Sequence, residues 1–217
     1  MKQHTLARNA IFNIIYKVVN VLFPLITTAY VSRILLPIGT GKVSYAQAIV
    51  SFFSLVAALG VPAYGTKVIS QIRNAPQEER NKNITALLVV LLVSSLVCSV
   101  SFYLFVALSG FFAEKELLYI LGLQIVFVAI NVDWFFQGNE RYGFMALRNA
   151  IIKAVSLILI FIFVRKFEDF PIYATIIVAG TVGNHLFNFL VMSRSFRFDF
   201  KGLKIRQHLA PIFVLLA

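Results

Sequence analysis

Apolar residues occur in long runs along the chain, and short charged or Gly/Pro-containing stretches separate these runs. A run of about 20 mainly apolar residues is the length that an α-helix needs to cross the hydrocarbon core of a bilayer. We therefore predict an all-α, polytopic transmembrane helix bundle with six spans and the start of a seventh. The predicted spans are residues 10–33, 44–66, 84–108, 117–137, 148–167 and 171–192, and the seventh begins near residue 208.

The end of the sequence falls inside an apolar segment. Residues 208–217 read HLAPIFVLLA, with no polar exit behind them. We therefore expect residues 1–193 to form the N-terminal transmembrane lobe of a longer protein, joined by a basic loop at 194–207 to a truncated seventh span. A transport path built from two lobes would need the second lobe as well.

Composition supports a membrane protein. Apolar residues make up 59% of the chain and charged residues 13%, whereas a soluble domain contains about 25% charged residues. A single cysteine, Cys98, excludes an intrachain disulfide. The net charge of +11 could suggest nucleic acid, but most of the Lys and Arg residues lie in loops between spans. We therefore expect membrane lipids as partners, and no nucleic acid.

The cations concentrate on one side of the predicted bundle, with thirteen there against five on the other side. Because cytoplasmic loops carry an excess of Lys and Arg, we predict a cytoplasmic N-terminus and a cytoplasmic 194–207 loop. The richer side holds Lys2, Arg8, Lys67, Arg73, Arg80, Lys82, Arg141, Arg148, Arg194, Arg197, Lys201, Lys204 and Arg206, and the other holds Arg33, Lys42, Lys115, Arg165 and Lys166.

Polar side chains recur inside five of the predicted spans, mostly at spacings of three and four residues, which places them on single helix faces. They are either hydrogen-bonding contacts between helices or the lining of a substrate pathway. The members that we consider for a pathway are Asn13, Lys17, Asn20, Gln47, Asp133, Gln137, Lys153, Asn184, His185 and Asn188. Asp133, Gln137 and Glu140 follow one another at i, i+4 and i+7 in the fourth span.

Ionisable side chains inside a span are costly, and they therefore indicate function more strongly than Ser or Asn does. Lys17, about two turns into its span, is the first candidate. Asp133 is either its salt-bridge partner or a separate proton or ion site. Lys153 either takes part in the pathway or extends its amine to the interface. His185 is either a hydrogen-bonded helix contact or a ligand.

Helix breakers interrupt two of the predicted spans. Pro24 lies within the polar face of the first span, and Gly60-Val61-Pro62 lies near the end of the second. Bent or broken helices beside polar residues are common where transporters bind and move, but Pro and Gly also produce ordinary kinks. The sequence leaves both explanations open.

Sequence motifs for catalysis are absent. The chain has no phosphate-binding loop, dinucleotide fingerprint, zinc-binding helix or nucleophile elbow. Its nine acidic residues are scattered, and Glu78-Glu79 and Glu168-Asp169 lie in predicted loops beside cations. We therefore expect no enzyme activity, no cofactor and no metal site.

Three segments resemble the polysaccharide-biosynthesis flippases. They are Arg8-Asn9-Ala10 before the first span, LGVPAYG at residues 59–65, and NVDWFFQGNE at residues 131–140. In these segments and in the order of its apolar runs, the chain is similar to Wzx-type O-antigen and capsule repeat-unit translocases. Their superfamily also contains multidrug extruders and the peptidoglycan-precursor flippase.

The resemblance implies one of two similar helical lobes around a central cavity. It implies a flippase that moves an undecaprenyl-diphosphate-linked oligosaccharide repeat unit across the bacterial inner membrane, from the cytoplasmic to the periplasmic leaflet. The product would serve surface polysaccharide synthesis (O-antigen of lipopolysaccharide, or capsule). Contacts with a polysaccharide polymerase or assembly proteins remain open.

The resemblance also implies roles for the polar residues. Lys17 and Lys153 would attract the diphosphate as point charges, and Asp133 would hold a cation in place or respond to a coupling proton. The amides would offer hydrogen bonds to sugar hydroxyls, and they are Asn13, Asn20, Gln47, Gln137, Asn184 and Asn188.

Two other functions remain open. A multidrug or organic-cation extruder of the same superfamily would favour anionic cavity residues, whereas this chain offers Asp133 against two lysines. The other is a non-transporting truncated membrane protein, which a natural stop after Ala217 would favour. The sequence does not determine the sugar composition, the coupling ion or the oligomeric state.

Overall fold

The computed structural model describes residues 23–110, 112, 114–200, 203 and 205–216, and all regular secondary structure among them is helical. The predicted all-α fold is therefore confirmed. A helical segment at residues 23–34 precedes α2. The helices are α2 (Leu36–Ala58), α3 (Val61–Gln71), α4 (Gln77–Leu108), α5 (Lys115–Phe127), α6 (Asp133–Gly138), α7 (Tyr142–Phe163), α8 (Phe170–Ser193) and α9 (Ile205–Leu216), with short 3-10 turns η1 (Val128–Ile130) and η2 (Phe167–Asp169).

Within the described residues, four helical segments are long and apolar enough to cross a membrane. They are Leu36–Gln71, Gln77–Leu108, Tyr142–Phe163 and Phe167–Ser193, and they coincide in part with the predicted second, third, fifth and sixth spans. About half of the predicted first span lies outside the described residues. The total of six spans and the start of a seventh therefore stays a prediction.

The surface of α4 shows how such a helix meets lipid. Leu92, Leu96, Val100 and Leu104 follow one another every four residues, and all four are more than half exposed. Residues spaced by four lie on one face of a helix, so α4 carries an exposed apolar stripe. Such a stripe suits contact with acyl chains, because it would be unfavourable in water.

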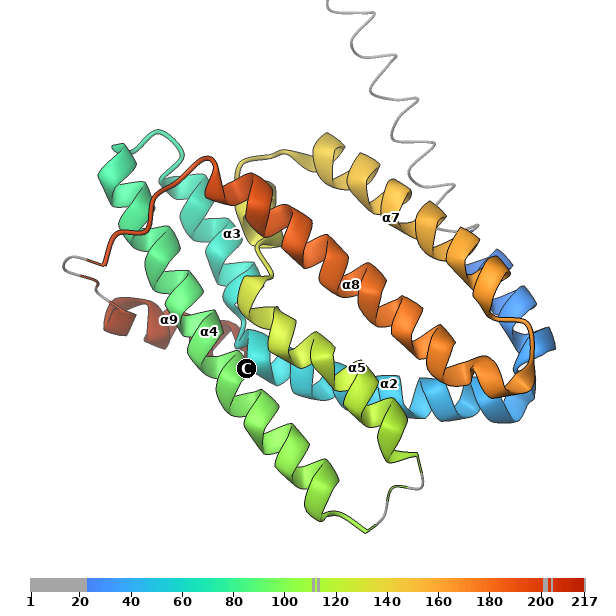
Figure 1. Cartoon of the computed structure of the whole chain (residues 1–217). Helices are drawn as coiled ribbons and strands as arrows, with labels where there is room; N and C mark the ends of the chain where they lie inside the picture. The colour runs from blue at the N-terminus through green and yellow to red at the C-terminus, as the bar shows by residue number, and fades with distance from the viewer. Residues whose placement is uncertain (1–22, 111, 113, 201–202, 204, 217) are drawn as a thin grey trace, which may run out of the picture.

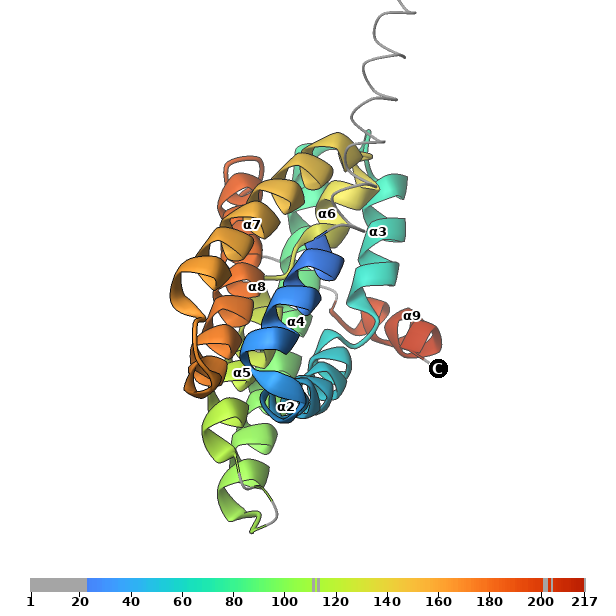
Figure 2. The ribbon, with the colours of Figure 1, turned by 90° about the vertical axis from the view of Figure 1, so that its right-hand side faces the viewer.

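The bundle is built around α5, which packs against α2, α4 and α8. Figure 1 shows α4, α5, α8 and α7 running in similar directions, with α2 crossing behind them, and Figure 2 shows α7 and α8 at one edge. Gly122 of α5 allows the close approach of α4, because a Cβ there would lie 2.5 Å from the Phe102 ring. The helix α7 packs against α8.

A second apolar cluster holds the 23–34 segment against the C-terminal end of α7 and the N-terminal part of α8. It contains Val31, Leu35, Ile160, Val164 and Ile176. The Tyr30 hydroxyl donates a hydrogen bond to the Val164 carbonyl oxygen at 2.9 Å, which satisfies a carbonyl at the C-terminal end of α7. The segment therefore packs against the C-terminal part of α7.

Two helices are broken rather than continuous. The break between α2 and α3 has left-handed backbone at Leu59 (φ 47°) and Gly60 (φ 72°), so the predicted Gly60-Val61-Pro62 interruption is present. The fourth predicted span is divided at residues 128–132 into α5 and α6. Asn131 supports this second break, because its carbonyl oxygen accepts a hydrogen bond from Trp134 Nε1 at 2.9 Å.

The second break changes the predicted polar face of the fourth span. The helix α6 begins at Asp133 and ends at Gly138, and Glu140 lies beyond it with a left-handed φ of 55°. The expectation that Asp133, Gln137 and Glu140 share one helical face is therefore wrong for Glu140. The apolar run continues through the break, so hydropathy alone could not reveal it.

Candidate functional site

The short helix α6 makes a close contact with α3. A Cβ on Gly65 of α3 would lie 2.9 Å from the Trp134 ring, and a Cβ on Gly138 of α6 would lie 2.6 Å from Ile69 Cβ and 2.8 Å from the Thr66 carbonyl oxygen. Glycine is therefore required at both positions for this approach. Two of the segments that resemble the flippases thus pack against one another as one unit.

Polar contacts hold α3 and α6 together near the C-terminal ends of both helices. Arg73 Nη2 donates a hydrogen bond to the Gly138 carbonyl oxygen at 2.9 Å and forms a 2.9 Å ion pair with Glu140. The Arg73 guanidinium, which donates to the carboxylate, lowers the pKa of Glu140. Thr66 Oγ1 donates to Gln137 Oε1 at 3.3 Å, so the predicted site residue Gln137 links α6 to α3.

A buried polar cluster joins the other side of α6 to α7 and α8. Arg148 Nη2 donates to Asp133 Oδ1 at 3.3 Å and to Asn149 Oδ1 at 2.9 Å, while Nη1 donates to Asn188 Oδ1. Asn188 Nδ2 donates in turn to Asp133 Oδ1. The polar cluster, as we call Asp133, Arg148, Asn149 and Asn188, therefore ties three helices together.

Local helix geometry explains these positions. Asp133 is the first residue of α6, where the positive end of the helix dipole favours a carboxylate. Arg148 lies two turns into α7, and its guanidinium lies 5.9 Å from the centroid of the Phe144 ring, one turn earlier. On α8, His185 lies three residues before Asn188, so both face the cluster.

The burial of Arg148 makes the pairing essential to the fold. Its side chain is 4% exposed, whereas that of Asp133 is 28% exposed. Transferring a charged group out of water costs several kcal/mol unless a partner and hydrogen bonds compensate it. Asp133, Asn149 and Asn188 supply that compensation, and the partly exposed carboxylate leaves the cluster accessible from outside.

Beside this cluster, two polar atoms are buried without a hydrogen-bond partner among the described residues, His185 Nδ1 and Asn184 Oδ1. His185 is 9% exposed and lies on α8 three residues before Asn188, a member of the cluster. A buried polar group without a partner is unfavourable by about 1–3 kcal/mol. These two atoms therefore have unused hydrogen-bonding capacity beside the cluster.

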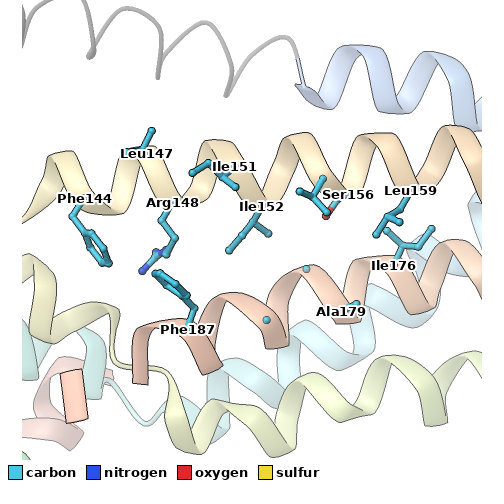
Figure 3. Close-up of a pocket in the computed structure, with 13 residues that line it drawn as sticks. Phe144, Leu147, Arg148, Ile151, Ile152, Ser156, Leu159, Ile176, Ala179 and Phe187 are labelled. Atoms are coloured by element: carbon cyan, nitrogen blue, oxygen red, sulfur yellow. The ribbon is translucent and has the colours of Figure 1, made fainter. Parts of the chain in front are cut away.

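An apolar groove between α7 and α8 ends at Arg148. Its volume is about 470 Å³. Figure 3 shows the Arg148 guanidinium beside the Phe144 and Phe187 rings at one end, and Leu159 and Ile176 at the other. The remaining lining residues are Leu147, Ile151, Ile152, Val155, Ser156, Ala179, Gly180 and Gly183. A cation at the end of an apolar groove suits an amphiphile with an anionic group.

The structure brings together some of the predicted site residues. Asp133 and Asn188 are bonded in the polar cluster, and Asn184 and His185 adjoin it on α8. Gln47 instead exchanges side-chain hydrogen bonds with Gln124 of α5, at 2.9 and 3.3 Å, and so joins α2 to α5. The predicted Asn13, Lys17 and Asn20 lie outside the described residues.

Lys153 occupies a different part of α7. Its Nζ lies 5.7 Å from the centroid of the Phe23 ring, so it contacts the 23–34 segment. An ammonium over an aromatic face is stabilised by the ring quadrupole. This contact links the segment to α7.

Arg148 lies inside a helix and not, as predicted, at the end of a loop. We counted it among the loop cations because the fifth span was predicted to begin there, but α7 begins six residues earlier, at Tyr142. The apolar residues Phe144 to Leu147 directly before Arg148 were an available signal that the helix had already begun. Without Arg148, the predicted cytoplasmic side has one loop cation fewer.

Comparison with known proteins gives the family. The family model described as polysaccharide biosynthesis protein matches residues 6–215. A curated protein of Shigella dysenteriae, named "Putative O-antigen transporter", is 29% identical over 153 residues, which are 69% of this chain and 37% of that protein. This chain thus covers well under half the length of that relative. No solved structure matches it significantly. The chain belongs to the polysaccharide biosynthesis protein family, as its motifs indicated.

Proposed function

We propose that this chain is part of a transporter that flips an undecaprenyl-diphosphate-linked oligosaccharide repeat unit from the cytoplasmic to the periplasmic leaflet. The observation that carries this proposal is the apolar groove that ends at the buried guanidinium of Arg148. A charged, sugar-bearing head group cannot cross hydrocarbon unaided, because its hydrogen bonds to water would be lost. The groove and the cation together offer surfaces for both parts of such a lipid.

Arg148 has the chemistry to bind the diphosphate. A guanidinium presents several donors in a plane that matches phosphate oxygens, and it stays charged when buried. Asp133 holds this guanidinium in the absence of substrate, so a phosphate would compete with Asp133 for the same donors. The exchange provides a physical means by which substrate could loosen α6 from α7 and α8.

The sugar would meet the polar atoms next to this cation. His185 Nδ1 and Asn184 Oδ1 are buried and lack partners among the described residues, so hydroxyl groups could satisfy them. We propose Asn188 as a further contact once Arg148 turns toward substrate. Lys17 and Lys153 remain proposed cations of the pathway.

In the cell, the proposed transporter spans the bacterial inner membrane with a cytoplasmic N-terminus and serves surface polysaccharide synthesis. Alternating access would come from rocking of this lobe against a second one. It would meet lipid-linked oligosaccharide, membrane lipids and, downstream, polymerase or assembly proteins. An organic-cation extruder is supported less, because the carboxylate of the described site is already paired with arginine.

Deletion of the parent gene tests the proposal. Loss of surface polysaccharide, with repeat units accumulating on the lipid carrier, is the expected result. Complementation with Arg148→Ala should leave the defect, while Arg33→Ala, which changes an exposed arginine outside the polar cluster, should restore the polymer. Intact polymer without accumulation after deletion would exclude the flippase and favour an extruder or a non-transporting protein.

A further inference from the structure

The segment that follows α8 runs back along the beginning of α4 (Figure 1). The backbone N–H of Arg197 donates to Asn81 Oδ1 at 3.3 Å, and that of Asp199 donates to Thr85 Oγ1 at 3.1 Å. Gln77 Nε2 donates to the Ser195 carbonyl oxygen at 3.2 Å. Three side chains of α4 thus hold the backbone of residues 195–199 in place.

Three phenylalanines at alternate positions form a ladder on this segment. The Phe196 and Phe198 ring centroids lie 4.9 Å apart, and the Phe198 and Phe200 rings stack at 6.0 Å with an interplanar angle of 8°. Phe196 is buried at 6% exposure, whereas Phe198 and Phe200 are 52% and 64% exposed. The phenylalanine ladder therefore has an anchored end and two rings directed outward.

The position of the ladder along α4 corresponds to the edge of a bilayer. The first turns of α4 are polar and charged through Asn83, and its apolar stretch begins at Ile84. The segment is held between Asn81 and Thr85, at this transition. The ladder lies where aromatic side chains are favoured, between water and hydrocarbon.

Cations accompany the ladder. Arg194 and Arg197 are exposed in the same segment. In the sequence, residues 194–206 carry five Lys or Arg residues and one acid, Asp199. Exposed apolar rings beside excess positive charge are typical of segments that lie on anionic membranes.

We propose that residues 194–200 bind the surface of an anionic leaflet. Phe198 and Phe200 enter the boundary between head groups and acyl chains, and Arg194 and Arg197 bind lipid phosphates. Anionic phospholipid is the partner that this charge complementarity selects. Such a contact would fix the link between α8 and α9 at the membrane surface, and it does not depend on which substrate the protein transports.

The test uses the whole chain reconstituted into vesicles, with Cys98→Ser removing its cysteine. An environment-sensitive fluorophore is attached at Phe198→Cys and, as the matched control, at Ser195→Cys, an exposed position of the same segment that lies outside the ladder. The vesicles contain either phosphatidylglycerol or phosphatidylcholine alone. A nitroxide near the top of the acyl chains of a tracer lipid serves as the quencher.

We expect emission at position 198 to shift to the blue and to be quenched by the nitroxide more strongly than at position 195. The quenching at 198 should fall in phosphatidylcholine and with Arg194→Gln/Arg197→Gln, because losing two interfacial cations weakens binding roughly thirtyfold.

Three results would overturn the proposal. Weak quenching at position 198, equal to that at 195, would place the ladder in water, and a blue shift without quenching would assign it to a protein partner. Quenching that is the same in both kinds of vesicle and in the double arginine variant would exclude anionic lipid as the partner. If a labelled variant fails to insert, tryptic cleavage of the unlabelled chain at Arg194 and Arg197 provides a second test. Binding to the anionic surface should protect both sites more in phosphatidylglycerol vesicles than in phosphatidylcholine vesicles. Equal cleavage in the two would contradict the proposal.

Discussion

The contact of α3 with α6 and the contact of α7 with α8 are built in opposite ways. Between α3 and α6 a single added methyl group would lie within 2.9 Å of the Trp134 ring or of Ile69. Between α7 and α8 there is a groove of about 470 Å³. Close packing favours one rigid arrangement, whereas the groove leaves space for a ligand.

Asp133 belongs to the first of these contacts through α6 and is bonded to both helices of the second. It begins α6, which is pressed against α3, and it is bonded to Arg148 of α7 and Asn188 of α8. The residues that resemble the flippases most closely therefore serve packing in part, while the buried cation of the polar cluster, Arg148, lies outside those motifs. A sequence motif can thus mark a close contact between helices that lies beside a functional site, and not the site itself.

Breaking the polar cluster should have the largest effect on stability. Asp133→Asn leaves the buried guanidinium of Arg148 without a counter-charge, and such a loss costs about 3–5 kcal/mol. The measurement is thermal unfolding of the purified protein in detergent. The double variant Asp133→Asn/Arg148→Met should regain most of the loss, and its failure to do so would show that the ion pair is not the cause.

An exposed ion pair supplies the matched control for this cluster. Glu78 lies 2.6 Å from Lys82 on the first turns of α4, and its side chain is 74% exposed. Exposed pairs contribute little, because water and salt screen them. Glu78→Gln should therefore leave the unfolding temperature nearly unchanged.

The close contact predicts the next largest effect. Gly138→Ala would force Cβ against Ile69 and the Thr66 carbonyl oxygen, and overpacking of this kind costs about 1–3 kcal/mol. Gly143→Ala in α7 is the control, since nothing lies within 4 Å of the added carbon. Equal unfolding temperatures for the two variants would contradict the rigid joint.

Filling the groove should separate function from stability. Gly183 lines the groove, and a Cβ there meets nothing within 4 Å. Gly183→Leu should not destabilise the fold, because glycine inside a helix is less favourable than leucine by about 1 kcal/mol, yet it should reduce surface polysaccharide in a complemented deletion strain. Normal polymer with normal protein levels would mean that the groove does not carry the lipid.

The smallest effect is the pH dependence of the stability that the Arg73–Glu140 ion pair contributes. Because Arg73 lowers the pKa of Glu140, the pair stabilises the folded state above the carboxylate's ordinary pKa, and the contribution is lost as the pH falls through the lowered value. The unfolding temperatures of the wild type and Glu140→Gln should differ above roughly pH 5 and converge in more acidic buffer. A difference that is constant with pH would exclude the ion pair as its source.

The sequence by itself determined the helical, membrane-protein character and the family, and it suggested several residues of the candidate site. Long apolar runs are a local property, and they report burial in lipid or protein without reference to distant residues. Asp133, Asn184, His185 and Asn188 stood out because polar groups in such runs are costly. The interruption at Gly60 was also readable, since glycine tolerates left-handed backbone.

Only the tertiary structure decided which polar groups meet. Asp133 is separated from Arg148 by 15 residues and from Asn188 by 55, and their contact depends on where α6 starts and how α7 lies on α8. It also showed that Gln47 and Gln137 join neighbouring helices. Periodicity gives the face of a helix on which a side chain lies, but the partner on that face depends on packing between helices distant in sequence.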